Sequence, residues 1–150
     1  MPPSFPIKYS RACLGDVRSC KELFRTVFAH SEWANWHLAW RNRNTRGCWV
    51  VRYNGVVIGA SLVSKDNVIK YIAIDPEYQG YKIGSALLNL VLGDLADVRS
   101  IRLTTAGDER LLTWYGRFGF RVTEIVNDAD GAFLGAHMVR RSHCRSAKRL

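Results

Sequence analysis

The chain lacks the features that mark secreted, membrane-bound or metal-stapled proteins. No stretch approaches the roughly 20 consecutive apolar residues that cross a bilayer as a helix. The first sixteen residues contain no apolar signal-peptide core, and their three prolines disrupt the amphipathic helix of a transit peptide. The four cysteines form no Cys-x-x-Cys pair and are scattered along the chain, which favours free thiols over disulfides or zinc. We therefore expect a cytoplasmic protein with no membrane attachment and no metal site.

Acidic residues are also scarce, and the resulting positive charge is concentrated at the C-terminal end of the chain. The chain has 13 Asp and Glu against 22 Lys and Arg, a net charge of +9, and its last eleven residues alone contribute +5. Such a segment can bind nucleic acid or an acidic surface. A solvated terminus explains it better, because no aromatic residue interleaves the charges. With no repeat or linker elsewhere, we expect one domain over residues 1–140 and a basic tail over 141–150.

The rest of the chain alternates between strand-like and helix-like segments. Apolar residues keep helical spacing over 17–28, and the segment 84–95 is apolar almost all round, as in a helix buried against a sheet. Asn54-Gly55 is typical of a type I′ hairpin turn. The pattern predicts an α/β (α+β) fold with a mixed, largely antiparallel sheet of about seven strands and helices on both faces. Its expected helices are 17–28, 33–40, 84–95 and 108–116, and its expected strands are 7–9, 48–53, 56–63, 68–74, 101–105, 120–126 and 132–139.

The strongest functional signal lies in the segment 71–88, which reads YIAIDPEYQGYKIGSALL. An apolar strand leads through Asp75-Pro76 into a turn with Gly80 and Gly84, and then into the apolar helix. A turn of this kind points several backbone N–H groups one way, with the positive end of the helix dipole behind them, and so suits a pyrophosphate. A plain strand–helix turn explains the segment equally well when it is taken alone.

A second segment makes the signal specific. The stretch YQGYKIGSALL resembles the acyl-CoA pyrophosphate loop of the GNAT N-acetyltransferases, Q/R-x-x-G-x-G/A, and Tyr115-x-x-x-Gly119-Phe120 resembles the family's Y-x-x-x-G-F segment. The resemblance covers residues 7–140 and implies an acetyl-CoA-dependent N-acetyltransferase that moves an acetyl group directly to a primary amine. Two alternatives stay open: a catalytically weak GNAT-like acyl-CoA-binding module whose tail binds nucleic acid or a partner, and a small basic nucleic-acid binder without a CoA site.

The resemblance also assigns roles to individual residues. It places the pantetheine arm on the backbone around Ile72 and Ile74, and it makes Tyr115 the group that protonates the departing thiolate, a task that suits a phenol with a reference pKa near 10. Asp108 falls where many relatives touch pantetheine, but it is equally suited to cap the following helix, and we favour the cap. The pyrophosphate is expected on Gln79, Gly80, Tyr81, Lys82, Ile83, Gly84 and Ser85.

Lys82 departs from the family pattern, which usually has glycine there. If that position requires a positive φ, lysine costs on the order of 1 kcal/mol. If it is already helical, lysine is tolerated and places a cation beside the phosphates. We favour the helical alternative, because an anion bound at a helix start gains from added positive charge.

The acceptor side is less defined. The strands 68–74 and 100–105 contain no carboxylate. Glu32 and His37 on the second helix are candidate bases, but a lone histidine among tryptophans is more often structural, so an ordered water is the expected proton acceptor. We expect the acceptor between the first two helices and the loop 127–131, where acids favour a cationic small amine or a protein lysine or N-terminus. Core packing is the simpler role for two of the helical tryptophans, and turn formation for the loop acids. The candidate residues for contacts with the acceptor are Glu32, Trp36, His37, Asp128 and Asp130. The identity of the acceptor and the oligomeric state, including a homodimer, are left open.

Overall fold

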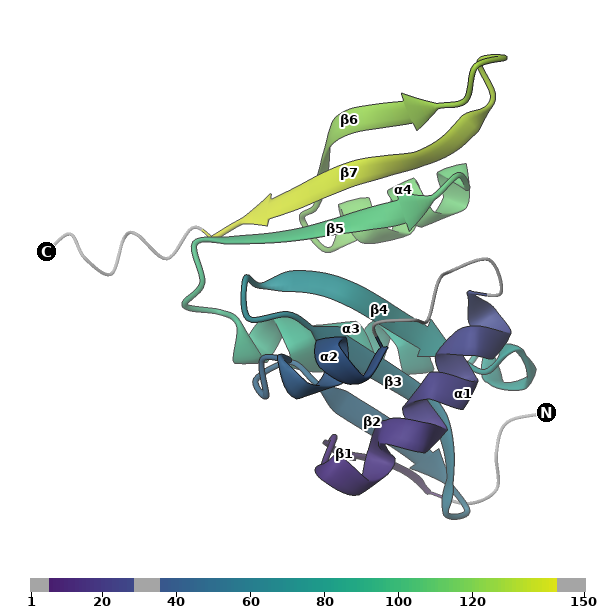
Figure 1. The fold of residues 1–150 in the computed structure, drawn as a ribbon, viewed down its shortest axis with the longest axis vertical. Helices are drawn as coiled ribbons and strands as arrows, with labels where there is room; N and C mark the ends of the chain where they lie inside the picture. The colour runs from purple at the N-terminus through teal and green to yellow at the C-terminus, as the bar shows by residue number, and fades with distance from the viewer. Residues whose placement is uncertain (1–5, 29–35, 143–150) are drawn as a thin grey trace, which may run out of the picture. The chain divides into compact units, whose positions relative to one another are not determined.

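A computed structural model describes residues 6–28 and 36–142 (Figure 1). Its seven strands form a sheet of order β1-β2-β3-β4-β5-β7-β6, in which β4 and β5 pair in parallel and the pairs β1–β2, β2–β3, β5–β7 and β7–β6 are antiparallel. The mixed, largely antiparallel sheet predicted from the sequence is therefore confirmed. The strands are β1 (Ile7–Arg11), β2 (Trp49–Tyr53), β3 (Val56–Val63), β4 (Val68–Ile74), β5 (Ser100–Ala106), β6 (Arg121–Asn127) and β7 (Phe133–Arg141). The α-helices are α1 (Val17–Val27), α2 (Trp36–Arg41), α3 (Ile83–Asp94) and α4 (Glu109–Arg117), with short 3-10 turns at η1 (Leu14–Asp16) and η2 (Pro76–Tyr78).

The chain divides into two compact units. The first holds residues 1–66 and 70–95, and the second holds 67–69 and 96–150. None of the helices in the described ranges is both long enough and apolar enough to cross a membrane.

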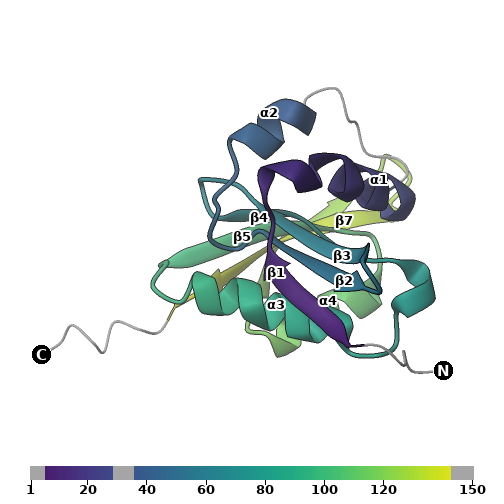
Figure 2. The same ribbon diagram turned by 90° about the horizontal axis from the view of Figure 1, so that it is seen from below.

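In the first unit, helices cover both faces of the strands. Figure 2 shows α1 and α2 on one face and α3 on the other. The amphipathic α1 buries Cys20 and Phe24, and α3 buries Leu87 and Val91 completely. The predicted burial of α3 against the sheet is confirmed, since its first turn and the strands share one apolar cluster of Val51, Ile58, Ile74, Ile83 and Leu87.

The hairpin between β2 and β3 has the predicted turn. Asn54 and Gly55 both have positive φ values, 52° and 79°. Type I′ geometry requires this at both central residues, and Asn-Gly supplies it at little steric cost. The turn fixes the pairing of β3, whose Ile58 lies beside the end of β4 and accepts a hydrogen bond from the Asp75 N–H.

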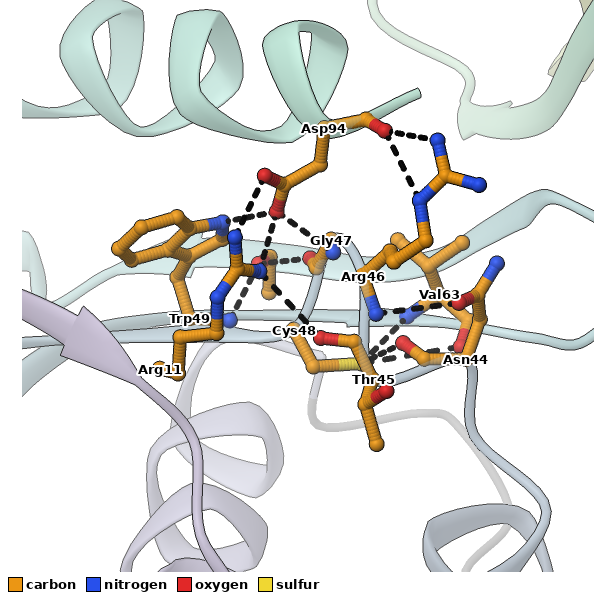
Figure 3. Close-up of polar contacts among 10 residues, drawn as sticks. Arg11, Asn44, Thr45, Arg46, Gly47, Cys48, Trp49, Val63 and Asp94 are labelled. Atoms are coloured by element: carbon orange, nitrogen blue, oxygen red, sulfur yellow. Dashed lines mark hydrogen bonds and ion pairs between the residues drawn. The ribbon is translucent and has the colours of Figure 1, made fainter. Parts of the chain in front are cut away.

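A polar network ties the C-terminal end of α3 to the first two strands (Figure 3). The Asp94 carboxylate accepts hydrogen bonds from both Arg11 Nη atoms (2.5 and 2.7 Å), from Trp49 Nε1 (2.8 Å) and from the Gly47 backbone N–H (2.9 Å). Arg46 donates through Nε to the Asp94 carbonyl (3.1 Å). The hydrogen bond from Arg11, and then those from Trp49 and Gly47, lower the pKa of Asp94 below its ordinary value.

In the second unit, α4 lies against β5 (Figure 1). Residues of β5 alternate between buried, as in Leu103, and exposed, as in Thr104. Arg140 of β7 donates through Nε to the carbonyl of Phe118, just after α4 (2.8 Å). The side chain of Arg140 therefore lies on the face of this sheet that α4 covers. Strand β7 continues to Arg141, one residue into the predicted tail, and most of that tail lies outside the described residues.

Candidate active site

The segment between β4 and α3 is held rigidly before the predicted pyrophosphate turn. The Asp75 backbone N–H donates to the carbonyl of Ile58 (2.7 Å), and the Asp75 carboxylate accepts from the Glu77 N–H (2.9 Å) to cap the turn η2. The side chain of Gln79 then donates through Nε2 to the carbonyl of Ile74 (3.0 Å). These bonds fix the direction in which the chain leaves the sheet and enters the turn.

The turn itself has the geometry of an anion cradle. Gly80 has a φ of +92°, and a Cβ built there would meet no atom within 4 Å, so its surface is open to a ligand. The Ala86 N–H donates to the Lys82 carbonyl, and consequently the four amides of residues 82–85 have no acceptor within the helix. These amides sit at the positive end of a 12-residue helix. Ile83 anchors the start of that helix in the apolar cluster.

Lys82 corrects one expectation. It is the N-cap of α3 and has a left-handed conformation, φ 65° and ψ 17°, so the favoured helical alternative is wrong. A side chain with a Cβ costs roughly 1–2 kcal/mol in this region, which is why the family pattern has glycine there. The lysine nevertheless is exposed at the start of α3, where it brings a positive charge to the turn.

Ile72 and Ile74 lie in the strand that leads to the turn, and both side chains pack in or against the apolar cluster. Their predicted contacts to pantetheine are main-chain contacts, so this packing is compatible with them. The carbonyl of Ile74 is already used as an acceptor by Gln79. Tyr81 lies in the turn and packs against the apolar cluster, while Gly84 and Ser85 lie in the first turn of α3. Their predicted roles toward a cofactor stay predictions.

Tyr115 occupies a buried position in α4, in the second unit. Its side chain is 8% exposed, and its ring makes edge contacts with Trp114 and Phe120, at centroid distances of 4.9 and 5.7 Å. Burial raises the pKa of Tyr115 to about 12, so its phenol keeps its proton at neutral pH. Gly119, with φ +92°, reverses the chain so that the Phe120 N–H donates to the Tyr115 carbonyl (3.2 Å). This contact gives the Tyr-x-x-x-Gly-Phe segment its physical basis.

Asp108 has the capping role that we favoured for it. It is the N-cap of α4, and its Oδ1 accepts from the backbone N–H of Arg110 (2.9 Å). Hydrogen bonds from the Arg110 side chain and backbone lower the pKa of Asp108. The carboxylate therefore organises the helix that holds Tyr115.

The predicted acceptor residues differ in what they offer. Trp36 is 3% exposed and packs against Phe24 and Trp40, so it belongs to the core, as the simpler interpretation held. His37 is exposed on α2. Asp128 accepts hydrogen bonds from the N–H groups of residues 130 and 132 and so forms the β6–β7 turn, in which Asp130 is exposed. Glu32 lies outside the described residues.

Sequence reasoning missed a polar row in the second unit. Thr104 on β5, Glu124 on β6 and His137 on β7 come together across the sheet, with Thr104 Oγ1 2.8 Å from His137 Nδ1. The residues are 33 and 13 positions apart in sequence, and their meeting depends on strand register. A histidine alternating with buried residues in a late strand was the available signal.

The described cysteines are free thiols, as predicted. Cys20 is completely buried, and burial raises its pKa to about 12. A thiol in that environment stays protonated and is a poor nucleophile. Cys20 is therefore part of the core.

The comparison with protein families identifies the class of protein. The sequence model of the acetyltransferase (GNAT) family matches residues 16–120, and the chain belongs to this family. A curated relative, an uncharacterized N-acetyltransferase of Methanocaldococcus jannaschii, is 28% identical over 114 residues, which are 66% of this chain and 50% of the relative. The chain thus spans about half the length of that relative.

Solved structures share the fold. Ard1 of Thermoplasma volcanium has a TM-score of 0.77 at 20% identity, over 91% of this chain and 97% of that one. Arabidopsis thaliana Naa50 has a TM-score of 0.74 at 18% identity, over 89% and 97%. The ribosomal-protein-S18-alanine N-acetyltransferase of Escherichia coli has a TM-score of 0.70 at 18% identity, over 97% and 99%. At these identities the similarity establishes the fold.

Proposed function

We propose that the protein is an N-acetyltransferase that uses acetyl-CoA and transfers the acetyl group directly to a primary amine. The observation that carries the proposal is the turn at Gly80, whose open surface and helix-start amides suit a pyrophosphate, in a chain of the GNAT family. Acetyl-CoA supplies the activated thioester. The amides of residues 82–85 hold its phosphates, and the strand before the turn directs its pantetheine arm.

Tyr115 is the proton donor in this mechanism. A phenol with a pKa near 12 stays protonated across the physiological range and can donate to the thiolate that leaves when the amine has attacked. Direct transfer needs no covalent enzyme intermediate. The buried Cys20 thiol stays protonated and is a poor nucleophile, which agrees with a mechanism that has no covalent enzyme intermediate.

The acceptor is a primary amine of a small molecule, a protein lysine or a protein N-terminus. Two proteins with the same fold support an N-terminus within this range: one is named for the ribosomal-protein-S18 alanine, and the other is in complex with the bisubstrate analogue CoA-Ac-MVNAL. The panel that tests the proposal contains polyamines, amino acids, lysine peptides and peptides with free N-termini. We expect acetyl-CoA to raise the Tm and at least one amine to release CoA.

A second candidate function is a catalytically weak acyl-CoA-binding module. The observation that favours it is the left-handed backbone of Lys82, a residue with a Cβ where the family pattern has glycine. An acetyl-CoA thermal shift with no CoA release from any amine would support the module, whereas no thermal shift at millimolar acetyl-CoA would contradict both candidates.

A further inference from the structure

A row of three polar side chains crosses the face of the second unit's sheet that is turned away from α4. Thr104 and Glu124 are both register partners of His137, from the strands on either side of it. His137 Nδ1 lies 2.8 Å from Thr104 Oγ1, and His137 Nε2 lies 3.7 Å from Glu124 Oε1. Arg140, three positions after His137, reaches the α4 side, so the alternation of a strand places His137 on the opposite face.

The row borders a hollow of about 410 Å³. The side chains of His137 and Glu124 are 47% and 68% exposed, so both reach a molecule bound there. Besides Glu124, the charged groups that line this hollow are Arg102 on β5 and Arg141 on β7; Arg121 on β6 lines the adjoining one. The start of β4 contributes an apolar valine to the wall.

The gap between His137 and Glu124 fits a protonated amine. When Nδ1 carries the ring proton and donates it to Thr104 Oγ1, Nε2 is an acceptor, and so is the Glu124 carboxylate. A separation of 3.7 Å is too long for a direct hydrogen bond between these two groups. An ammonium group has three donors and can bond both acceptors at once, while Glu124 supplies the opposite charge.

We propose that this row binds the acceptor amine and that His137 is the general base that removes its proton. The inference rests on the proposed acetyl transfer. An N–H bond of the ammonium breaks, the proton moves to His137 Nε2, and the nitrogen keeps the electron pair with which it attacks the thioester carbon. The C–S bond then breaks, the departing thiolate takes the proton of Tyr115, and the second proton lost by the nitrogen restores the phenol. Glu124 stabilises the resulting imidazolium. Imidazole suits this role because one ring nitrogen accepts a proton while the other donates its own.

Thr104 is a positioning residue in this arrangement. In the tautomer that the proposal requires, its oxygen, 2.8 Å from Nδ1, accepts the Nδ1 proton and so keeps Nε2 free for the amine. The row therefore supplies the base that the strands 68–74 and 100–105 lack. Its members come from three different strands, which is why no single strand contains a recognisable base.

The test measures kcat/KM from pH 6 to 10 with the amine that gives the fastest CoA release in the acceptor panel. We expect His137→Gln to lower kcat/KM about 10²–10⁴-fold at pH 7. With rising pH, kcat/KM of the His137→Gln variant should increase about tenfold per pH unit until the amine is neutral in solution. The reason is that this variant can use only amine molecules that have already lost their proton. Glu124→Gln raises KM more than it lowers kcat. Glu109→Gln, an exposed carboxylate at the start of α4, is the matched control and keeps the native profile.

Two further variants test the alignment of the ring without removing it. Thr104→Val is expected to lower kcat about tenfold, and Thr104→Ser to restore it. All variants should keep the acetyl-CoA thermal shift. A His137→Gln protein with the native rate and pH profile, or equal rates in Thr104→Val and Thr104→Ser, overturns the inference alone. Absence of CoA release by the native protein overturns the proposed function, and this inference with it.

Discussion

At the scale of single residues, Lys82 combines two opposing effects. Its left-handed backbone is strained, and its ammonium group brings positive charge to the turn that is proposed to bind phosphates. The helix dipole favours an anion at this end by typically about 0.3–1 kcal/mol at an exposed site and disfavours a cation there, so the lysine charge is useful only toward a bound anion. The strain costs roughly 1–2 kcal/mol, so the residue trades stability of the fold against attraction of the ligand.

Two substitutions separate these effects. Lys82→Ala and Lys82→Gly remove the same charge, but only glycine adopts the left-handed conformation freely. We expect the glycine variant to be more stable than the alanine variant by about 1 kcal/mol in urea unfolding. Both should bind acetyl-CoA more weakly than the native protein and with a shallower dependence on salt. Equal stability of the two variants would contradict the strain, and a native salt dependence would contradict the charge.

Tyr115 allows a separate prediction about chemistry. Tyr115→Phe keeps the ring that packs between Trp114 and Phe120 and removes only the hydroxyl. We expect kcat to fall, by up to about 10²–10⁴-fold, with little change in the acetyl-CoA dissociation constant. The loss should be larger at low pH than above pH 9, because a thiol with a reference pKa near 8.5 then leaves as the thiolate unaided. Native kcat throughout this range, with chemistry rate-limiting, would remove Tyr115 from the mechanism.

At the scale of elements, Asp94 joins α3 to β1 and to the loop before β2. All the groups that contact its carboxylate are donors, so an amide at this position would turn its own N–H group toward one of them. Because this helix begins at the proposed pyrophosphate turn, its attachment also supports the site. The network is thus a structural link between the sheet and the cradle.

Asp94→Asn tests this link. We expect the free energy of unfolding to fall by about 1.5–3 kcal/mol at pH 7, the range for a hydrogen bond to a charged group. The folded pKa of Asp94 is lowered, so its stabilisation is complete above the unfolded pKa near 4 and is lost as the pH falls through the folded value. The difference between native protein and variant should therefore shrink below about pH 4.

The matched control is Asp66→Asn, at an exposed position between β3 and β4. It should leave the free energy of unfolding within about 0.5 kcal/mol of the native value, as surface substitutions usually do. A difference for Asp94→Asn that stays constant down to pH 2 would contradict the assigned pKa direction.

Most of the elements were predictable because their signals are local. The strands β3 and β4 have the predicted bounds, and Asn54-Gly55 forms the predicted turn. The bounds of β5 differ by one residue at each end, since pairing of Ser100 with Arg141 and of Ala106 with Gly135 extends it beyond its apolar pattern. The 3-10 turn η2 was not predicted, because it depends on the contact by which the Asp75 side chain caps it.

The candidate site was only partly predictable, because only those of its parts that lie within one continuous segment leave a local signal in the sequence. The cradle at Gly80 and the position of Tyr115 each follow from one continuous segment. The row through His137 depends on which residues of three strands face each other, and a register shift between Val122 and Glu124 alters that alternation. No local pattern reveals such a shift, so the row emerged from the structure alone.

At the scale of the whole molecule, the net charge of +9 raises the question of what the basic tail does. The segment 143–150 contains three of the positive charges and no apolar periodicity, while the last strand ends before it. The Ser142 N–H still donates to the carbonyl of Arg99 (2.8 Å), so the folded part includes this residue. A cut after Ser142 therefore preserves every described backbone pair of β7.

Truncation after Ser142 should leave acetyl transfer to a small amine within about twofold of the native kcat/KM, because the removed segment follows the last strand and its sequence has no apolar periodicity to dock it. If the native chain binds nucleic acid or an acidic protein through the tail, truncation should weaken that binding and reduce its dependence on salt, since each phosphate-paired cation contributes to that slope. A full-length chain with Arg145, Lys148 and Arg149 replaced by glutamine separates charge from length. If it behaves like the truncated chain toward these partners, charge is the operative property. Loss of small-amine turnover in the truncated but folded chain would instead show that the tail takes part in catalysis.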